Sequence, residues 1–165
     1  MKKIAVIMGS DSDWPVVKAA VDTLIALEIP VEARVLSAHR TPEAAMSFAK
    51  SAREDGFGAI IAAAGKAAHL AGVLAGNTTL PVIGLPIGGS GGLGGLDALL
   101  STVQMPSGIP VATVAIDGAK NAALLAAQIL GVTEPEIARR LSALREEMEG
   151  SIAAKNAALQ KKIGS

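Results

Sequence analysis

The chain has 165 residues, a length typical of one domain with a sizeable core, and we expect residues 1–165 to form a single domain. Its 15 basic and 15 acidic residues balance without a basic block, which excludes a general binder of nucleic-acid phosphates. The lack of Cys excludes disulfides and thiolate catalysis. The apolar runs are too short for a signal-peptide core or a membrane span, so we predict a cytoplasmic protein.

Apolar runs alternate with segments of helical character over the first 130 residues. In chain order, we expect a strand at 3–8, a helix from about 13 to 27, a strand at 31–36, a helix opening at Thr41-Pro42, a strand at 59–63, a helix at 67–75, a strand at 81–85, a helix at 93–103, a strand at 110–115 and a helix at 119–130. Ser12 or Asp13 can cap the first helix, and Thr41 can cap the second. The alternation predicts a parallel α/β sheet with helices on both faces and strands buried on both sides.

Residues 134–163 follow as a long, charged helical tail. Apolar residues in its first part recur at helical spacing, at Ile137, Leu141, Leu144 and Met148. We expect this tail to pack on the fold or on a neighbouring subunit, with its charged side chains in solvent.

Ligands of parallel α/β sheets bind beyond the carboxyl ends of the strands, which directs attention to the segments that follow the first three predicted strands. The first is Gly9–Asp13. Its glycine, the hydroxyls of Ser10 and Ser12 and the amides of a helix start suit a phosphate, and the Asp13 carboxylate suits ribose hydroxyls. The same residues also suit a plain capped turn, and this segment alone leaves the two interpretations open.

The second segment runs from Ser37 to Arg40. Histidine is the usual proton-transfer residue near neutral pH, so His39 is a candidate for that role, although a lone His is more often structural. Arg40 can bind a phosphate or a carboxylate through two hydrogen bonds. The neighbouring Arg40 and the position at the expected ligand edge favour a functional role for His39.

The third segment contains Ala64, Gly65, Lys66, His69 and Leu70. Its small residues allow close approach to a flat ring or a carboxylate. His69 is either a second polar contact or merely a helix residue with one satisfied nitrogen. Two histidines without a third ligand make a weak metal site, so we expect no metal.

A glycine-rich run, Gly88–Gly95, matches the dinucleotide pattern G-x-G-x-x-G between a predicted strand and a predicted helix, with Asp117 after the next strand. Six of these eight residues are glycine, so a chance match is easy. We interpret the run as a mobile lid rather than as a nicotinamide or flavin site.

The sequence resembles the PurE family of purine biosynthesis over nearly its whole length. The resemblance lies in the segments Met8–Trp14, Ser37–Pro42, Ala67–Leu70, Pro81–Gly84, Gly95–Ser101 and Val103–Thr113. It implies a three-layer α/β/α fold with a flavodoxin-like parallel sheet of about five strands and a long C-terminal helix. It also implies a homo-octamer with sites at subunit contacts and an isomerase without metal or organic cofactor. The implied reaction moves a carboxylate from the exocyclic nitrogen of 5-(carboxyamino)imidazole ribonucleotide to ring carbon 4.

The resemblance also implies residue roles. His39 would be the acid and base of the reaction, while Ser10, Asp13 and Arg40 would contact the nucleotide. Ser12 and Ser37 would bind its phosphate. The remaining substrate-binding residues would be Ala64, Gly65, Lys66, His69 and Leu70.

Two positions depart from the mutase pattern, which usually has Gly at Lys66 and Pro at Ala71. Animal-type relatives that carboxylate aminoimidazole ribonucleotide directly with carbon dioxide have a basic residue at position 66. They have Lys in place of Arg40, however, and lack the run Ala67–Leu70, so these residues favour the mutase. The alternatives are the direct carboxylase and a flavodoxin-like nucleotide-binding module without catalysis.

Overall fold

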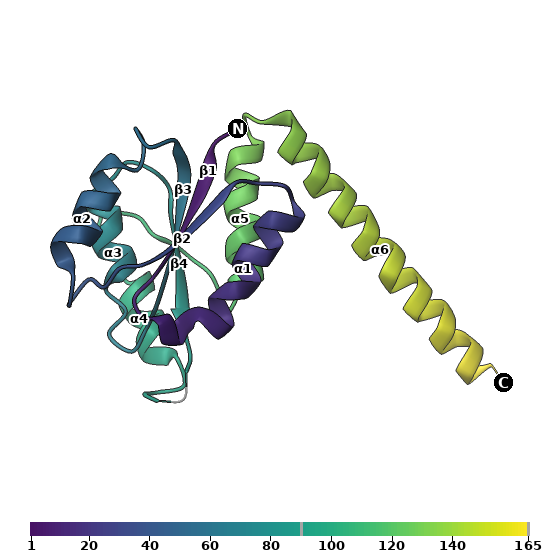
Figure 1. Ribbon diagram of the computed structural model, residues 1–165. Coiled ribbons are helices and arrows are strands. Elements are labelled where there is room, and N and C mark those ends of the chain that lie inside the picture. Colours follow the sequence, from purple (N-terminus) through teal and green to yellow (C-terminus); the bar gives the residue numbers. More distant parts are fainter. Residues whose placement is uncertain (90, 165) are drawn as a thin grey trace.

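Five parallel strands form one sheet in the computed structural model, which describes residues 1–89 and 91–164. The sheet order is β2-β1-β3-β4-β5 (Figure 1). The strands are β1 (Lys3–Met8), β2 (Val31–Val35), β3 (Phe57–Gly65), β4 (Val82–Ile87) and β5 (Ala112–Thr113). This is the flavodoxin-like order: β2 is added on one side of β1, and the later strands are added on the other side, beginning with β3. The predicted parallel sheet of about five strands is therefore confirmed.

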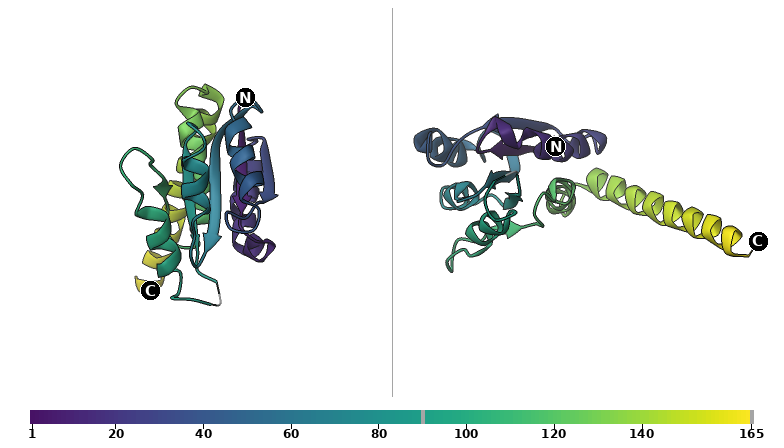
Figure 2. Two further views of the ribbon diagram at one scale, coloured as in Figure 1. Left: turned by 90° about the vertical axis from the view of Figure 1, so that its left-hand side faces the viewer. Right: turned by 90° about the horizontal axis from the view of Figure 1, so that it is seen from below.

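Helices cover both faces of the sheet and complete three layers (Figures 1 and 2). One face carries α1 (Trp14–Ala26) and α5 (Ala119–Gly131). The other carries α2 (Pro42–Ser51), α3 (Leu70–Ala75) and α4 (Leu96–Val103). Each face has its own apolar core, because alternate residues of a strand point to opposite sides of the sheet. In β1, Ile4 and Val6 join the core under α1 and α5, whereas Ala5 and Ile7 join the other.

Alanine allows the close packing of this protein, which has few aromatic residues. Five buried alanines of α5 contribute to the core that it shares with α1: Ala119, Ala122, Ala123, Ala126 and Ala127. Their small side chains let the two helices and the sheet approach closely, so a dense core forms with only three aromatic residues in the chain.

Some predicted boundaries were wrong. The α4 helix begins at Leu96 instead of residue 93, because Gly94 and Gly95 have φ values of 63° and 86°, which no right-handed helix accommodates. The strand β5 has two residues instead of six, and it pairs only with β4 at the edge of the sheet. The other edge strand, β2, is partly exposed and not buried on both faces.

The helix α6 (Pro135–Ile163) packs on the fold only through its first turns. Ile137 is fully buried and Leu141 packs beside it against the core under α5. Arg140 donates from Nη1 to the carbonyl oxygen of Leu27 at 2.8 Å and pairs with the Glu28 carboxylate at 2.7 Å. The rest of α6 projects away from the fold (Figures 1 and 2), so packing of that part on a neighbouring subunit stays a prediction.

Candidate active site

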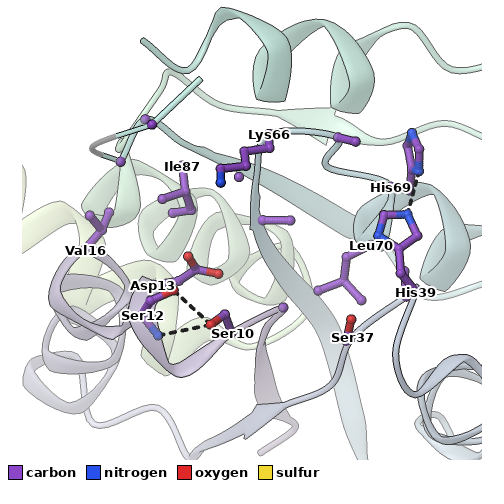
Figure 3. A pocket seen from close by; sticks show the side chains of 18 of the residues that line it. Ser10, Ser12, Asp13, Val16, Ser37, His39, Lys66, His69, Leu70 and Ile87 are labelled. Atoms are coloured by element: carbon purple, nitrogen blue, oxygen red, sulfur yellow. Dashed lines mark hydrogen bonds between the residues drawn. The ribbon is translucent and has the colours of Figure 1, made fainter. Parts of the chain in front are cut away.

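The loops that follow β1, β2, β3 and β4 meet around one cavity of about 800 Å³ at the carboxyl edge of the sheet (Figure 3). All eleven residues predicted for the site line this cavity: Ser10, Ser12, Asp13, Ser37, His39, Arg40, Ala64, Gly65, Lys66, His69 and Leu70. The topological rule for parallel sheets thus located the cavity correctly, although the residue roles remain predictions.

The loop after β1 forms a short 3-10 helix, Asp11–Asp13. Ser10 caps it, since its Oγ accepts from the Ser12 backbone N–H at 3.3 Å and lies 2.8 Å from Ser12 Oγ. Asp13 is the N-cap residue of α1, as predicted, but its side chain makes no capping hydrogen bond. A carboxylate that caps nothing remains available to a ligand.

Burial raises the pKa of the Asp13 carboxyl above its ordinary value. A hydrogen bond from the Ser10 backbone and the charge of Arg40 oppose that rise, and the nearby Asp11 adds to it. Asp13 is therefore a partly desolvated carboxylate at the cavity wall, a position where ligand hydroxyls can replace the lost water.

Side chains of the loop after β2 form hydrogen bonds to backbone groups of the same loop. Ser37 Oγ accepts from the Arg40 backbone N–H at 3.1 Å, and Thr41 Oγ1 accepts from the Ser37 N–H at 2.9 Å. Thr41 is the N-cap residue of α2, as predicted, but its side chain bonds back to Ser37 and makes no capping hydrogen bond. The guanidinium of Arg40 crosses to the first loop, where Nη2 donates to the Gly9 carbonyl oxygen at 3.2 Å.

The two histidines of the chain meet at the cavity. His39 Nε2 lies 2.8 Å from His69 Nδ1, and the rings stand edge to face at 88° with centroids 4.9 Å apart (Figure 3). One nitrogen must carry the proton and the other must accept it, so the tautomer of each ring depends on that of its partner. The structure places His69 in polar contact with His39 at the cavity wall, and its role in binding substrate stays a prediction.

Lys66 directly follows β3 and has a φ of 55°, in the left-handed region that favours glycine. The adjacent Gly65 is also constrained, because a Cβ there would lie 3.3 Å from the carbonyl oxygen of Ile87. The Lys66 side chain extends along the cavity wall, with Nζ 3.8 Å from where a Cβ of Gly91 would be. A strained lysine at a ligand cavity is a candidate for a functional role.

The glycine-rich run contributes Gly88, Gly89 and Gly91 to the cavity wall. Ser90 of this run lies outside the described residues. Asp117, which the dinucleotide pattern would assign to a ribose, instead accepts the Gly88 backbone N–H at 2.8 Å. This bond fixes the backbone where the glycine-rich run begins. It agrees with our interpretation that the run is not a dinucleotide site.

Sequence reasoning missed three apolar residues of the wall. Pro15, Val16 and Ile87 also line the cavity. Ile87 ends β4 and could have been found by applying the carboxyl-edge rule to the fourth strand. The wall therefore combines polar loops with an apolar side that can exclude water.

The described part of the chain offers neither a metal-binding cluster nor a membrane-spanning helix. Residues 1–89 and 91–164 include no group of three or more His, Asp or Glu side chains placed to hold a metal ion. Over the same ranges, every helix is too short or too polar to cross a bilayer.

Comparison with known proteins places the chain in a family. The family model described as AIR carboxylase matches residues 3–151. The N5-carboxyaminoimidazole ribonucleotide mutase of Mycobacterium tuberculosis (strain H37Rv) is 54% identical over 98% of this chain and 92% of its own length. The protein of the same name from Pyrococcus abyssi is 58% identical over 90% of this chain and 85% of its own length.

A solved structure agrees with these sequence relatives. The crystal structure of Treponema denticola PurE superimposes with a TM-score of 0.85 at 30% identity, covering 94% of this chain and 97% of that one. The resemblance to the PurE family is thereby confirmed, and the chain belongs to the AIR carboxylase family.

Proposed function

We propose that this protein is an N5-carboxyaminoimidazole ribonucleotide mutase of purine biosynthesis. It isomerises 5-(carboxyamino)imidazole ribonucleotide to 4-carboxy-5-aminoimidazole ribonucleotide. Relatives with that activity in their names match nearly the whole chain at 54–58% identity. The observation that carries the proposal is the hydrogen-bonded pair of His39 and His69 at a cavity that the nucleotide-binding edge of the sheet provides.

The cavity offers a polar and an apolar side for the two parts of this substrate. The phosphate lies against Ser12, Ser37 and Arg40, since hydroxyls and a guanidinium suit an anion of this charge. Ser10 and Asp13 bind the ribose hydroxyls. The imidazole ring lies against Ala64, Gly65 and Leu70, with Lys66 and His69 at its carboxylate side.

His39 serves both halves of the carboxyl transfer. As imidazolium it gives a proton to the exocyclic nitrogen while the nitrogen–carbon bond breaks, which releases carbon dioxide and leaves the amine. Ring carbon 4 then attacks the same carbon dioxide and forms the new carbon–carbon bond. The neutral imidazole finally removes the proton of carbon 4, which restores the ring and the imidazolium. No oxidant or cofactor is needed for this balance.

His69 holds the His39 ring in place between the two proton transfers. Its Nδ1 lies 2.8 Å from His39 Nε2, so the pair can share a proton in either direction. Both side chains are exposed in one chain, whereas carbon dioxide must stay confined between the two steps. The proposal therefore includes closure of the site by another subunit.

The surface supports assembly into the homo-octamer that the family resemblance implies. Exposed leucines and a valine follow one another along α4 and the segment before it, at Leu93, Leu96, Leu100 and Val103. The projecting part of α6 exposes Met148, Ile152, Leu159 and Ile163. Apolar patches of this kind usually mark contacts with other subunits. The number of subunits can be measured by light scattering of the purified protein. The proposal also includes a single domain over residues 1–165 and a cytoplasmic location.

The deciding experiment gives the purified enzyme each candidate substrate separately. The mutase converts the carboxyamino nucleotide without added bicarbonate, and the rate is measured by the absorbance of the 4-carboxy product. Turnover of only the uncarboxylated nucleotide, with bicarbonate present, would mean a direct carboxylase instead. Nucleotide binding without turnover of either compound would mean the non-catalytic module.

A further inference from the structure

Two adjacent hydroxyls of α4 hold the loop that carries His69. Ser101 Oγ accepts the backbone N–H of Ala68 at 3.1 Å, and Thr102 Oγ1 donates to the carbonyl oxygen of Ala68 at 3.4 Å. The proton of Ser101 is within reach of the carbonyl oxygens of Lys66 at 3.2 Å and Asp97 at 2.5 Å. Both backbone polar groups of the residue before His69 are thus bonded by side chains of another helix.

The burial of these groups makes the bonds consequential. Ala68 is 1% exposed, and Thr102, at 2%, is the one buried polar side chain among the described residues. A buried backbone group without a hydrogen-bond partner destabilises the folded arrangement around it. Without the hydroxyls of Ser101 and Thr102, the Ala68 peptide must move toward water to recover its hydrogen bonds, and His69 moves with it.

We propose that Ser101 and Thr102 are positioning residues for the proposed mutase reaction, because they set the place of His69 and, through it, the ring of His39. This inference rests on the proposed function. The His39–His69 bond of 2.8 Å leaves little room for displacement, since a shift of about 1 Å breaks a hydrogen bond of normal geometry. Displacements of that size in a catalytic constellation cost about 100-fold in rate.

The two chemical features of Thr102 can be separated by mutation. Its Cγ2 methyl packs over Gly84, so closely that a Cβ at Gly84 would overlap it. Thr102→Val keeps the methyl and removes the hydroxyl, whereas Thr102→Ser keeps the hydroxyl and removes the methyl. Ser101→Ala removes the neighbouring hydroxyl. Thr23→Val is the matched control, because Thr23 Oγ1 donates to the Ala19 carbonyl oxygen at 2.7 Å on the exposed side of α1, away from the site.

We expect Thr102→Val and Ser101→Ala to lower kcat about 10- to 100-fold with KM changed less than about twofold. Thr102→Ser and Thr23→Val retain kcat within about twofold. A second readout needs no substrate. The chain has two histidines, so nitrogen NMR of their rings reports both protonation states directly. The titration curves of both rings shift in Thr102→Val and not in Thr102→Ser.

A purely structural role predicts a different pattern. If Thr102→Val lowers the melting temperature while kcat and both histidine titrations stay at wild-type values, the positioning role is wrong. The same holds if Thr102→Ser loses as much activity as Thr102→Val, because packing would then be the cause. Failure of the proposed function is distinct: the wild type would turn over no substrate, while the histidine titrations would still report whether the hydroxyls position the pair.

Discussion

Among the described residues, charged side chains form ion pairs at the amino end of the sheet, whereas cations at its carboxyl end lie unpaired at the cavity. At the amino end, Lys3 pairs with Glu32 at 3.0 Å and Arg140 pairs with Glu28 at 2.7 Å. At the carboxyl end, Arg40 and Lys66 have no ion-pair partner in the described part of the chain, although both line the cavity. The amino end uses charge to hold the fold together, and the carboxyl end keeps charge available for a ligand.

The pKa shifts of two carboxyl groups show the same contrast. Hydrogen bonds from Lys3 and Arg34 lower the pKa of Glu32, so its ionised form is stabilised by folding. Burial raises the pKa of Asp13, so its ionised form is disfavoured by folding. A binding site commonly reduces the stability of the free protein in this way, because its groups are arranged for a ligand.

The largest expected effect is loss of turnover on replacing His39. His39→Asn keeps a polar side chain but cannot exchange protons near neutral pH, so we expect kcat to fall at least about 100-fold. Nucleotide affinity and melting temperature should stay near wild type, as measured by calorimetry. Full activity in this variant would assign the proton transfers to another group.

Replacing Arg40 at the carboxyl end should affect substrate binding, whereas replacing Arg140 at the amino end should affect stability. Arg40→Ala removes a cation from the cavity, so we expect KM to rise about tenfold or more, since a charge-assisted hydrogen bond contributes about 1.5–3 kcal/mol. Arg140→Ala removes bonds to Leu27 and Glu28 and should lower the free energy of unfolding by about 1–2 kcal/mol with KM unchanged. Steady-state kinetics and urea unfolding of both variants test this, and identical behaviour of the pair would contradict the contrast.

Asp13→Asn should separate function from stability. Ionised Asp13 is partly buried, so at neutral pH we expect the Asn variant to unfold at a higher temperature than wild type while losing activity. The raised pKa means that wild type loses stability as pH rises through that pKa. The advantage of the variant should therefore disappear as pH falls below the ordinary value of 3.8. A lower melting temperature for the variant at pH 7 would show that the carboxylate stabilises the fold.

Lys66→Gly tests the strained position. Glycine adopts a φ of 55° freely, whereas another residue there costs about 1–2 kcal/mol, partly offset by the greater entropy of glycine in the unfolded chain. We expect the free energy of unfolding to rise by up to about 1 kcal/mol with mutase turnover retained. Chemical denaturation measures the first and the product assay the second. If turnover is lost, Lys66 is required for the reaction in this protein.

The smallest effect is expected at Glu32. Its lowered pKa contributes stability above the ordinary value of 4.5, and that contribution is lost as pH falls through the folded-state pKa. Glu32→Gln should therefore lower stability slightly at pH 7, within the roughly 0.2–1 kcal/mol of an exposed pair, and leave it unchanged in acid. Melting curves at pH 3 and pH 7 measure this difference, and a kinetic effect would contradict the separation of the two ends.

The sequence alone predicted the order of the elements and the polar residues that line the cavity, because both depend on local patterns. Apolar runs predicted all five strands, and each polar loop followed directly from the end of a strand. The rule that ligands bind at the carboxyl edge then united Ser10, Arg40 and Lys66 in one cavity without any knowledge of their distances.

The tertiary structure decided which of these side chains touch. His39 follows β2 and His69 follows β3, two strands that flank β1 and are not neighbours in the sheet, so no sequence pattern could predict their contact. The hydroxyls of Ser101 and Thr102, which bind the backbone of Ala68, come from a helix over 30 residues further along the chain. The helical periodicity of α6 likewise does not predict that most of the helix projects away from the fold. The point at which a helix stops packing depends on where the core ends, not on the pattern of its residues. Contacts between distant segments depend on strand order and packing, which local sequence patterns do not encode.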